Sequence, residues 1–359
     1  MSNQTPGIGT SRNGNETSPT KPLNPNHLTR AQIQHHIELF GSKLILDGKD
    51  LQGEDLSGFK LSATSFISAN LSNITLIQAI LDSTDFGNAI MVNAKLVKAN
   101  LSSANLQGIN LEGSDLSETN MEDTNMGKGN LKKTCFKKSN LSRANVESAE
   151  FTSAILIEAN LVEIKAQKTD FTKSDLNKSN LYNGNFTEAI FVEANLQNVV
   201  SSVGYSSAVY FIRANFRNAK LDFSRLTGAN FRQAELSGSS LNSAKLDKTD
   251  FSEANLTSAN LSAATMNQSN LSNANLTNAI LRQTKLGSSN LQNAIMQNAI
   301  LENADLSTVN ALNANFCGAN LTGVKFNGAN LQGAKYDKNT IWPQGIIPSI
   351  VGAVLVEVK

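Results

Sequence analysis

The sequence has little of the chemistry that enzymes and metalloproteins require. Its 359 residues include three histidines and two cysteines. His27, His35 and His36 all lie near the amino terminus, and their spacing matches no zinc-binding signature. General acid–base chemistry needs an acid and a base held close together in a pocket. We therefore predict that the protein is not an enzyme and has no catalytic residue, metal ligand or cofactor.

The chain also lacks a secretory leader and any long apolar run. Residues 1–20 have no hydrophobic signal core and no basic start, and no apolar stretch approaches the length of a membrane span. These absences exclude a membrane partner and predict a cytoplasmic protein.

An excess of charge of either sign is missing as well. Lysine and arginine number 31 and acidic residues 30, for a formal charge of +1, so no net field would recruit nucleic acid. The densest basic cluster lacks interleaved aromatic residues, and acids such as Glu112 and Glu118 precede it by about twenty residues. We expect those acids to neutralise its members, which are Lys128, Lys132, Lys133, Lys137, Lys138 and Arg143.

What the sequence does contain is one pattern repeated every five residues from 46 to 341. A large apolar residue falls on positions ending in 1 or 6, as at Leu101 and Leu106, and a small residue stands two positions earlier. A helix would spread these leucines around its circumference, and a strand would send alternate ones to opposite faces. Each five-residue unit must therefore contain a bend, and the units must form the sides of stacked coils.

Phenylalanine indicates the number of sides. A twenty-residue spacing separates successive members of one series: Phe151, Phe171, Phe191, Phe211, Phe231 and Phe251. Rings stacked at the same corner of successive coils would explain this spacing, with four sides to a coil. The prediction is an all-β, four-sided parallel solenoid of about 15 coils. Cys135 and Cys317 would then lie on the order of 40 Å apart, too far for a disulfide.

The repeated triplets resemble the A(D/N)LXX signature of the pentapeptide-repeat protein family. Examples are Ala229-Asn230-Phe231, Ala254-Asn255-Leu256 and Ala259-Asn260-Leu261. The resemblance implies a right-handed quadrilateral β-helix, with the leucine or phenylalanine and the small residue facing inward. It implies almost nothing about function.

The remaining segments are predicted as follows. Residues 1–28 are polar and form a disordered tail, and residues 29–45 form a capping helix and lead-in. Thr29 is the expected N-cap, Ile33, Ile37 and Phe40 share one helical face, and Gly41 ends the helix. Residues 342–359 form a C-terminal cap in which Trp342, Ile346, Ile347 and the apolar residues from Ile350 to Val356 cover the last coil. The alternative for residues 351–358 is an edge strand that pairs with a second molecule to form a homodimer.

The repeat fails most seriously in an irregular coil at residues 197–210. Small Ser201 and Ser206 take inward positions, while apolar and aromatic residues take outward ones. One interpretation is a local bulge. The other is an exposed protein-binding patch, whose candidate residues are Ile190, Val200, Val203, Tyr205 and Tyr210.

Two functions remain after these exclusions. The first is a non-catalytic protein-interaction scaffold or spacer built on a rigid rod, with an unknown protein partner. The alternative rests on the resemblance, because fluoroquinolone-resistance members of the family mimic DNA and bind type II topoisomerases. That role requires a strongly negative surface, and the neutral charge disfavours it.

Overall fold

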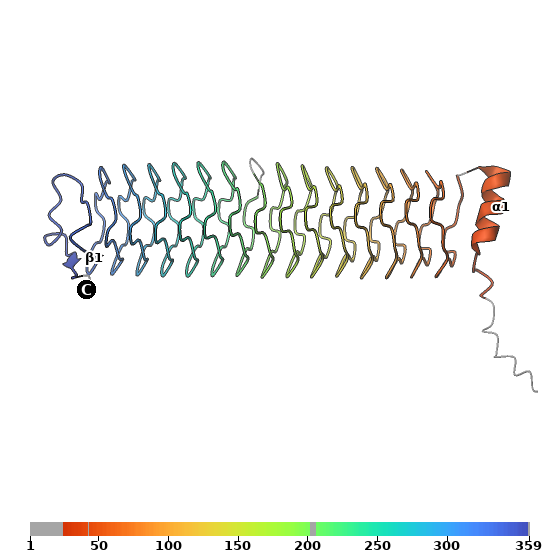
Figure 1. Cartoon of the computed structure of the whole chain (residues 1–359), viewed down its shortest axis with the longest axis horizontal. Coiled ribbons are helices and arrows are strands. Elements are labelled where there is room, and N and C mark those ends of the chain that lie inside the picture. The colour runs from red at the N-terminus through yellow and green to blue at the C-terminus, as the bar shows by residue number, and fades with distance from the viewer. Residues whose placement is uncertain (1–23, 42, 202–205, 358–359) are drawn as a thin grey trace, which may run out of the picture.

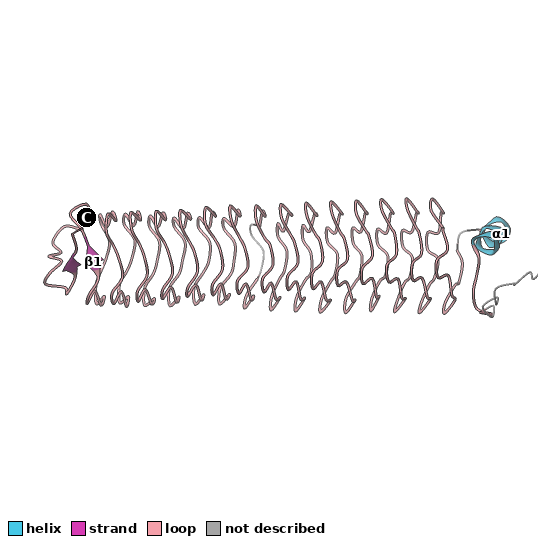
Figure 2. Ribbon diagram, turned by 60° about the horizontal axis from the view of Figure 1, so that its bottom comes forward, coloured by secondary structure: helices cyan, strands magenta, loops and turns pink. Residues whose placement is uncertain are grey.

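The chain forms a long rod of stacked coils, seen from two sides in Figures 1 and 2. The structure is a computed structural model that describes residues 24–41, 43–201 and 206–357. Parallel bridges join residues twenty positions apart, from Ile45 and Ser65 near one end to Asn310 and Asn330 near the other. Four five-residue units therefore close one coil, and the prediction of a four-sided β-solenoid is confirmed.

Each unit is a β-turn followed by one bridged residue. In the unit of Leu101, the Ala104 N–H donates to the Leu101 carbonyl at 3.0 Å, and Ser103 inside the turn has a φ of 57°. A turn of type II requires a positive φ at this place. The same left-handed conformation recurs along the rod two residues after the inward leucine, and lysine, glutamate and serine adopt it as well as glycine and asparagine.

The asparagine that precedes many of the inward leucines completes the hydrogen bonding of the unit. The N–H groups of Leu101 and Ser103 donate to carbonyls of the next coil, on Asn120 and Glu122, at 2.7 and 2.8 Å. The Ser102 N–H instead donates to the Asn100 side-chain oxygen at 3.2 Å. Asparagine and aspartate are favoured at this position because their side chains readily accept from the backbone two residues further on.

The core is a column of leucine, phenylalanine and alanine. The predicted phenylalanine series stacks from coil to coil, and the Phe171 and Phe191 rings lie 4.6 Å apart and 9° from parallel. Phe66 and Phe86 repeat this arrangement at 4.9 Å. Offset stacking adds to the burial of these rings, so the structure confirms the reason for the twenty-residue spacing.

At the N-terminal end, helix α1 (Arg30–Phe40) lies beside the first coil (Figure 1). Thr29 forms a capping box with Gln32, and the Gly41 N–H closes the helix on the Ile37 carbonyl, as predicted. Ile33 is fully buried and Ile37 packs against the core. The side chain of Phe40 is outside the described residues.

The predicted boundary of the amino-terminal tail is wrong for residues 24–28. His27 bridges to Asp50, and its Nε2 atom lies 3.1 Å from a Glu54 carboxylate oxygen. The Leu28 N–H donates to the Asp50 carbonyl at 2.9 Å, and Leu28 packs against the core. Pairing with an open coil edge offsets the ordering entropy that composition alone could not. Residues 1–23 lie outside the described residues.

At the C-terminal end, β1 (Lys335–Tyr336) pairs in parallel with β2 (Val354–Leu355). Trp342 packs edge-on against Tyr336, with ring centroids 5.5 Å apart. Ile347, Ile350, Val354 and Leu355 are exposed, so the expectation that they cover the last coil is wrong for these four residues. Consecutive turns bury Ala353 and leave both isoleucines facing outward.

Candidate protein-interaction surface

Ile190 and Tyr210 lie one above the other on the outside of the rod. They are bridge partners in successive coils, and their exposed fractions are 36% and 46%. Both occupy the position before the inward phenylalanine, where the repeat usually has asparagine. The structure therefore brings two of the five predicted residues together.

Two further residues complete this apolar area and were missed by the sequence analysis. Val192 and Ile212 follow Phe191 and Phe211 on the same side of the rod, are partly exposed, and lie in adjacent coils. The sequence could have identified both residues, because the repeat usually has a polar residue directly after the inward residue and here has valine and isoleucine. We call Ile190, Val192, Tyr210 and Ile212 the 190–212 patch.

Charged side chains border the 190–212 patch. The Arg213 guanidinium lies 2.6 Å from the Glu193 carboxylate, and the Lys173 ammonium approaches the same carboxylate at 3.8 Å. An apolar centre that includes a tyrosine, with a polar rim, is typical of protein–protein interfaces.

Val200 does not join this patch. Its bridges run to Asn180 and Lys220, ten residues and half a coil away from the column of Ile190 and Tyr210, so it lies on the opposite side of the rod. Val203 and Tyr205 are outside the described residues. The coils on either side keep their register, since Asn195 bridges to Asn215 across the interruption.

Inside the irregular coil, Ser201 and Ser206 replace larger inward residues and leave a cavity of about 30 Å³. Phenylalanines and leucines of the adjacent coils form most of its lining. The lapse in the repeat therefore loosens the packing locally without shifting the phase of the coils.

Three further isoleucines near the C-terminal end, Ile280, Ile295 and Ile300, also occupy the outward position before an inward residue. Ile280 and Ile300 are bridge partners, as expected from their spacing. Ile295 bridges instead to Asn275 and Asn315 on the neighbouring side of the rod.

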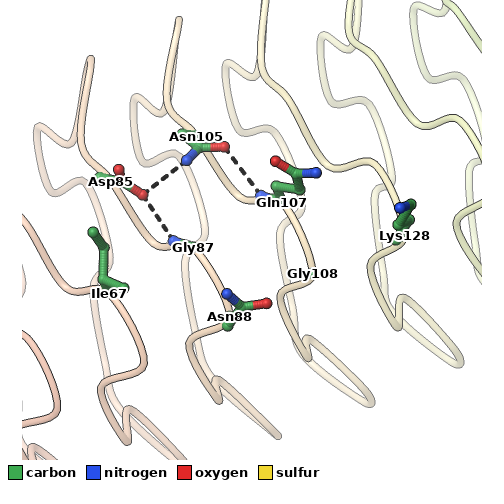
Figure 3. Close-up of a pocket in the computed structure, with 8 residues that line it drawn as sticks. All are labelled: Ile67, Asp85, Gly87, Asn88, Asn105, Gln107, Gly108 and Lys128. Carbon is green, nitrogen blue, oxygen red and sulfur yellow. Dashed lines mark hydrogen bonds between the residues drawn. The ribbon is translucent and has the colours of Figure 1, made fainter.

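A polar hollow of about 660 Å³ lies over the coils near Gly87 (Figure 3). The Asp85 carboxylate accepts from the Gly87 N–H and from the Asn105 amide, both at 2.9 Å. Glycine at 87 and 108 opens the hollow, and Lys128 lies at its far edge. Besides Lys128, its lining consists of Ile67, two glycines, the side-chain amides of Asn88, Asn105 and Gln107, and the engaged carboxylate of Asp85.

The expectation that acids of adjacent coils neutralise the basic cluster is met only in part. Four of its six members form ion pairs with such acids, whereas Glu118 pairs with Lys98 outside the cluster. Lys133 pairs with Glu112 at 3.0 Å, and Lys132 pairs with Glu150 at 2.5 Å. Arg143 binds Asp123 at 2.8 Å and also contacts Glu122. The hydrogen bond from Arg143 lowers the pKa of the Asp123 carboxyl.

Across the described residues, no group of three or more histidine, cysteine or acidic side chains could hold a metal ion. Both cysteines are free thiols, and burial raises the pKa of Cys317. In the described part of the chain, no helix is long and apolar enough to cross a membrane.

Family comparison agrees with this architecture. The model described as pentapeptide repeats (8 copies) matches residues 60–165 in overlapping segments, and also 167–200 and 299–335. A second model, described as a pentapeptide repeat region, matches residues 209–291. The chain belongs to the pentapeptide-repeat family. Curated proteins gave no match.

Several solved pentapeptide-repeat structures are similar to this chain. HetL, a protein involved in heterocyst differentiation regulation from the cyanobacterium Nostoc sp. strain PCC 7120, is 23% identical over 89% of this chain and 100% of its own, with a TM-score of 0.20. Rfr23 from the cyanobacterium Cyanothece 51142 is 39% identical over 29% of this chain and 63% of its own, with a TM-score of 0.17.

A third similar structure is QnrB1, a plasmid-mediated fluoroquinolone resistance protein. It is 19% identical over 55% of this chain and 87% of its own, with a TM-score of 0.26. All three TM-scores are low, so the fold assignment rests on the repeat and the bridges described above.

Proposed function

We propose that this pentapeptide-repeat protein is a non-catalytic, cytoplasmic scaffold or spacer that binds a protein partner through the 190–212 patch. The observation that carries the proposal is the exposed pair Ile190–Tyr210, stacked on a flat side of the rod beside the Glu193–Arg213 ion pair. A rod of about 15 coils, capped by α1 and by residues 342–357, would present this patch without rearrangement.

The test compares affinity capture by the intact protein and by an Ile190→Ser, Tyr210→Ser variant. The matched control is Ile155→Ser, Ile295→Ser, because these residues occupy the same repeat position and are 39% and 38% exposed. Any captured protein is then purified and its binding measured by calorimetry. We expect the patch variant to bind at least tenfold more weakly than the control, since central tyrosines dominate many interfaces. Equal binding by the two variants would rule out the patch.

Self-association through the C-terminal end is a separate part of the proposal. β2 has one partner strand, β1, in the described sheet, and Leu355 is 60% exposed. A second copy could add to the other edge of β2. Sedimentation of the intact protein and of Leu355→Arg tests this pairing, and a monomer at all concentrations would exclude it.

Topoisomerase binding by DNA mimicry is not favoured. Such mimicry requires a strongly acidic surface, and the chain carries a formal charge of +1.

A further inference from the structure

One side of the C-terminal half of the rod carries an excess of positive charge. This side comprises the units whose inward residues run from Leu226 to Phe326 in twenty-residue steps. Its charged residues are five basic and two acidic: Arg225, Lys245, Lys248, Lys285 and Lys325, with Asp247 and Asp305. We call the five basic residues the basic stripe.

The other three sides are electrically balanced over the same length. Between residues 209 and 328 they carry five basic and five acidic residues in total, and each side is neutral by itself. The near-zero charge of the whole chain therefore conceals a local asymmetry. A local field of this kind can select and orient a charged partner even when the net charge is small.

The arginines of the balanced sides are engaged in ion pairs. Arg217 pairs with Glu235 at 3.2 Å, and Arg282 pairs with Glu302 at 2.9 Å. In contrast, the four lysines of the basic stripe are exposed and make no ion pair within 4.0 Å to any described residue.

The two acids on this side are occupied by neutral donors. Asp247 accepts from the Thr265 hydroxyl at 2.8 Å and from the Asn267 amide at 2.9 Å. Asp305 accepts from the Ser307 N–H at 3.0 Å. The hydrogen bonds from Ser307, and to a lesser extent the charges of Lys325 and Lys285, lower the pKa of Asp305, so this carboxylate offsets part of the positive charge of its column. The side as a whole keeps an excess of three positive charges.

Four members of the basic stripe lie in one straight column. Successive bridges run along this column in the order Arg225, Lys245, Thr265, Lys285, Asp305 and Lys325. Thr265 and Asp305 therefore separate some of the basic residues. At about 4.8 Å per coil, the five coils from Arg225 to Lys325 extend about 24 Å. An extended polypeptide of about seven residues has this length, with its alternate side chains on one face.

An exposed aromatic residue lies beside one end of the column. Phe223 precedes Arg225 by two residues and is 59% exposed. It could receive one apolar side chain of a bound segment. A nucleic acid strand would instead need aromatic platforms for successive bases. Over described residues 206–328 the other exposed aromatic side chain, Tyr210, lies on a different side.

We propose that the basic stripe binds an extended acidic polypeptide segment that places one apolar side chain against Phe223. This proposal deepens the proposed function, since it names the chemistry of a protein partner, and it rests on the rod being an interaction protein. It uses a side of the rod distinct from the 190–212 patch, so the two surfaces can be tested separately.

The test is fluorescence anisotropy with a labelled glutamate-rich peptide that contains one leucine. The variant is Lys245→Gln, Lys285→Gln, and the matched control is Lys60→Gln, Lys95→Gln, since all four lysines are exposed and hold the same repeat position. We expect the stripe variant to bind about tenfold more weakly, the control to bind like the intact protein, and added salt to weaken binding. Phe223→Ser should weaken binding severalfold by removing the apolar contact.

Three outcomes would overturn the inference: no binding of the peptide at low salt, equal losses in the stripe variant and the control, or tighter binding of a single-stranded oligonucleotide of equal charge. If the peptide fails while a captured protein still depends on Ile190 and Tyr210, the interaction role survives without the acidic partner. If the peptide binds as expected while the 190–212 patch variant binds its partner normally, the acidic-segment proposal stands and the role of the 190–212 patch is ruled out.

Discussion

The Asn270 side-chain amide donates to the Asp250 carboxylate, one coil toward the amino terminus, at 3.1 Å. Asn290 donates to Asn270 at 3.2 Å, and Asn310 donates to Asn290 at 3.3 Å. Each amide thus donates toward the amino terminus and accepts from the carboxy-terminal side. The result is a hydrogen-bonded ladder with a fixed direction along the outside of the rod.

Aspartate begins other ladders in the same way. Asn105 donates to Asp85 at 2.9 Å, and Asn195 donates to Asp175 at 2.8 Å. An ionised carboxylate accepts hydrogen bonds but cannot donate them. It can therefore accept from the side-chain amide of the next coil, but it cannot donate to the side chain of the previous coil. This asymmetry explains why aspartate stands at the amino-terminal end of these ladders.

We predict that Asn290→Asp will destabilise the rod by about 1 kcal/mol, because it removes the donor to Asn270 in the middle of a ladder. The control is Asp250→Asn, which keeps the acceptor for Asn270 and should change the free energy of unfolding by less than about 0.5 kcal/mol. Urea unfolding measures both. A loss of stability that is as large for Asp250→Asn would contradict the directional ladder.

The left-handed turn residues provide a second prediction. Ala263 has a φ of 56°, whereas its neighbour Ala264 is fully buried as the small inward residue. Ala263→Gly should stabilise the protein by up to about 1 kcal/mol, since glycine adopts this conformation without strain. Ala264→Gly should destabilise it by about 1 kcal/mol through lost packing and greater freedom of the unfolded chain. Thermal unfolding shifts of the same sign would contradict this assignment of the turn.

Removing one ring from the phenylalanine stack should have a local effect. Phe231 lies 4.8 Å from Phe211 and 4.7 Å from Phe251, measured between ring centroids. Phe231→Ala should cost about 3–5 kcal/mol through the cavity it leaves, and Phe231→Leu much less. Hydrogen exchange should rise mainly in the adjacent coils, because each coil contacts only its neighbours. A uniform loss of protection along the rod would contradict this expectation.

A surface charge reversal should depend on salt. The Lys98 ammonium lies 3.6 Å from the Glu118 carboxylate. Glu118→Lys should lower stability by about 0.2–1 kcal/mol at low ionic strength and recover partly at high salt. Glu147→Lys is the control, since uncharged Gly127 and Gln167 flank it in its column. The idea fails if both reversals have the same effect in dilute buffer.

Much of the architecture follows from the sequence because a single inward pattern repeats without a shift of phase. Leu101 and Leu106 can both be buried only if the chain bends between them, and the step from Phe171 to Phe191 requires four sides. Burial of large apolar side chains dominates the folding free energy, so these inward residues determine the coil without knowledge of the outer ones.

The outer surface was decided by the tertiary structure. A twenty-residue period places Glu118 between Lys98 and Lys138, yet the ion pairs that form are Lys98–Glu118 and Lys138–Glu158, at 3.6 and 3.8 Å. The same period could not show that His27 pairs with the first coil, because His27 precedes the repeat. An exposed charged side chain can pair with any of several neighbours at nearly equal free energy, so its partner does not follow from spacing. A segment outside the repeat lacks the five-residue pattern from which its position could be predicted. Sequence periodicity therefore determines the buried column and the stacking of outward positions, whereas the tertiary structure determines which neighbouring charges pair and how the segments outside the repeat are placed.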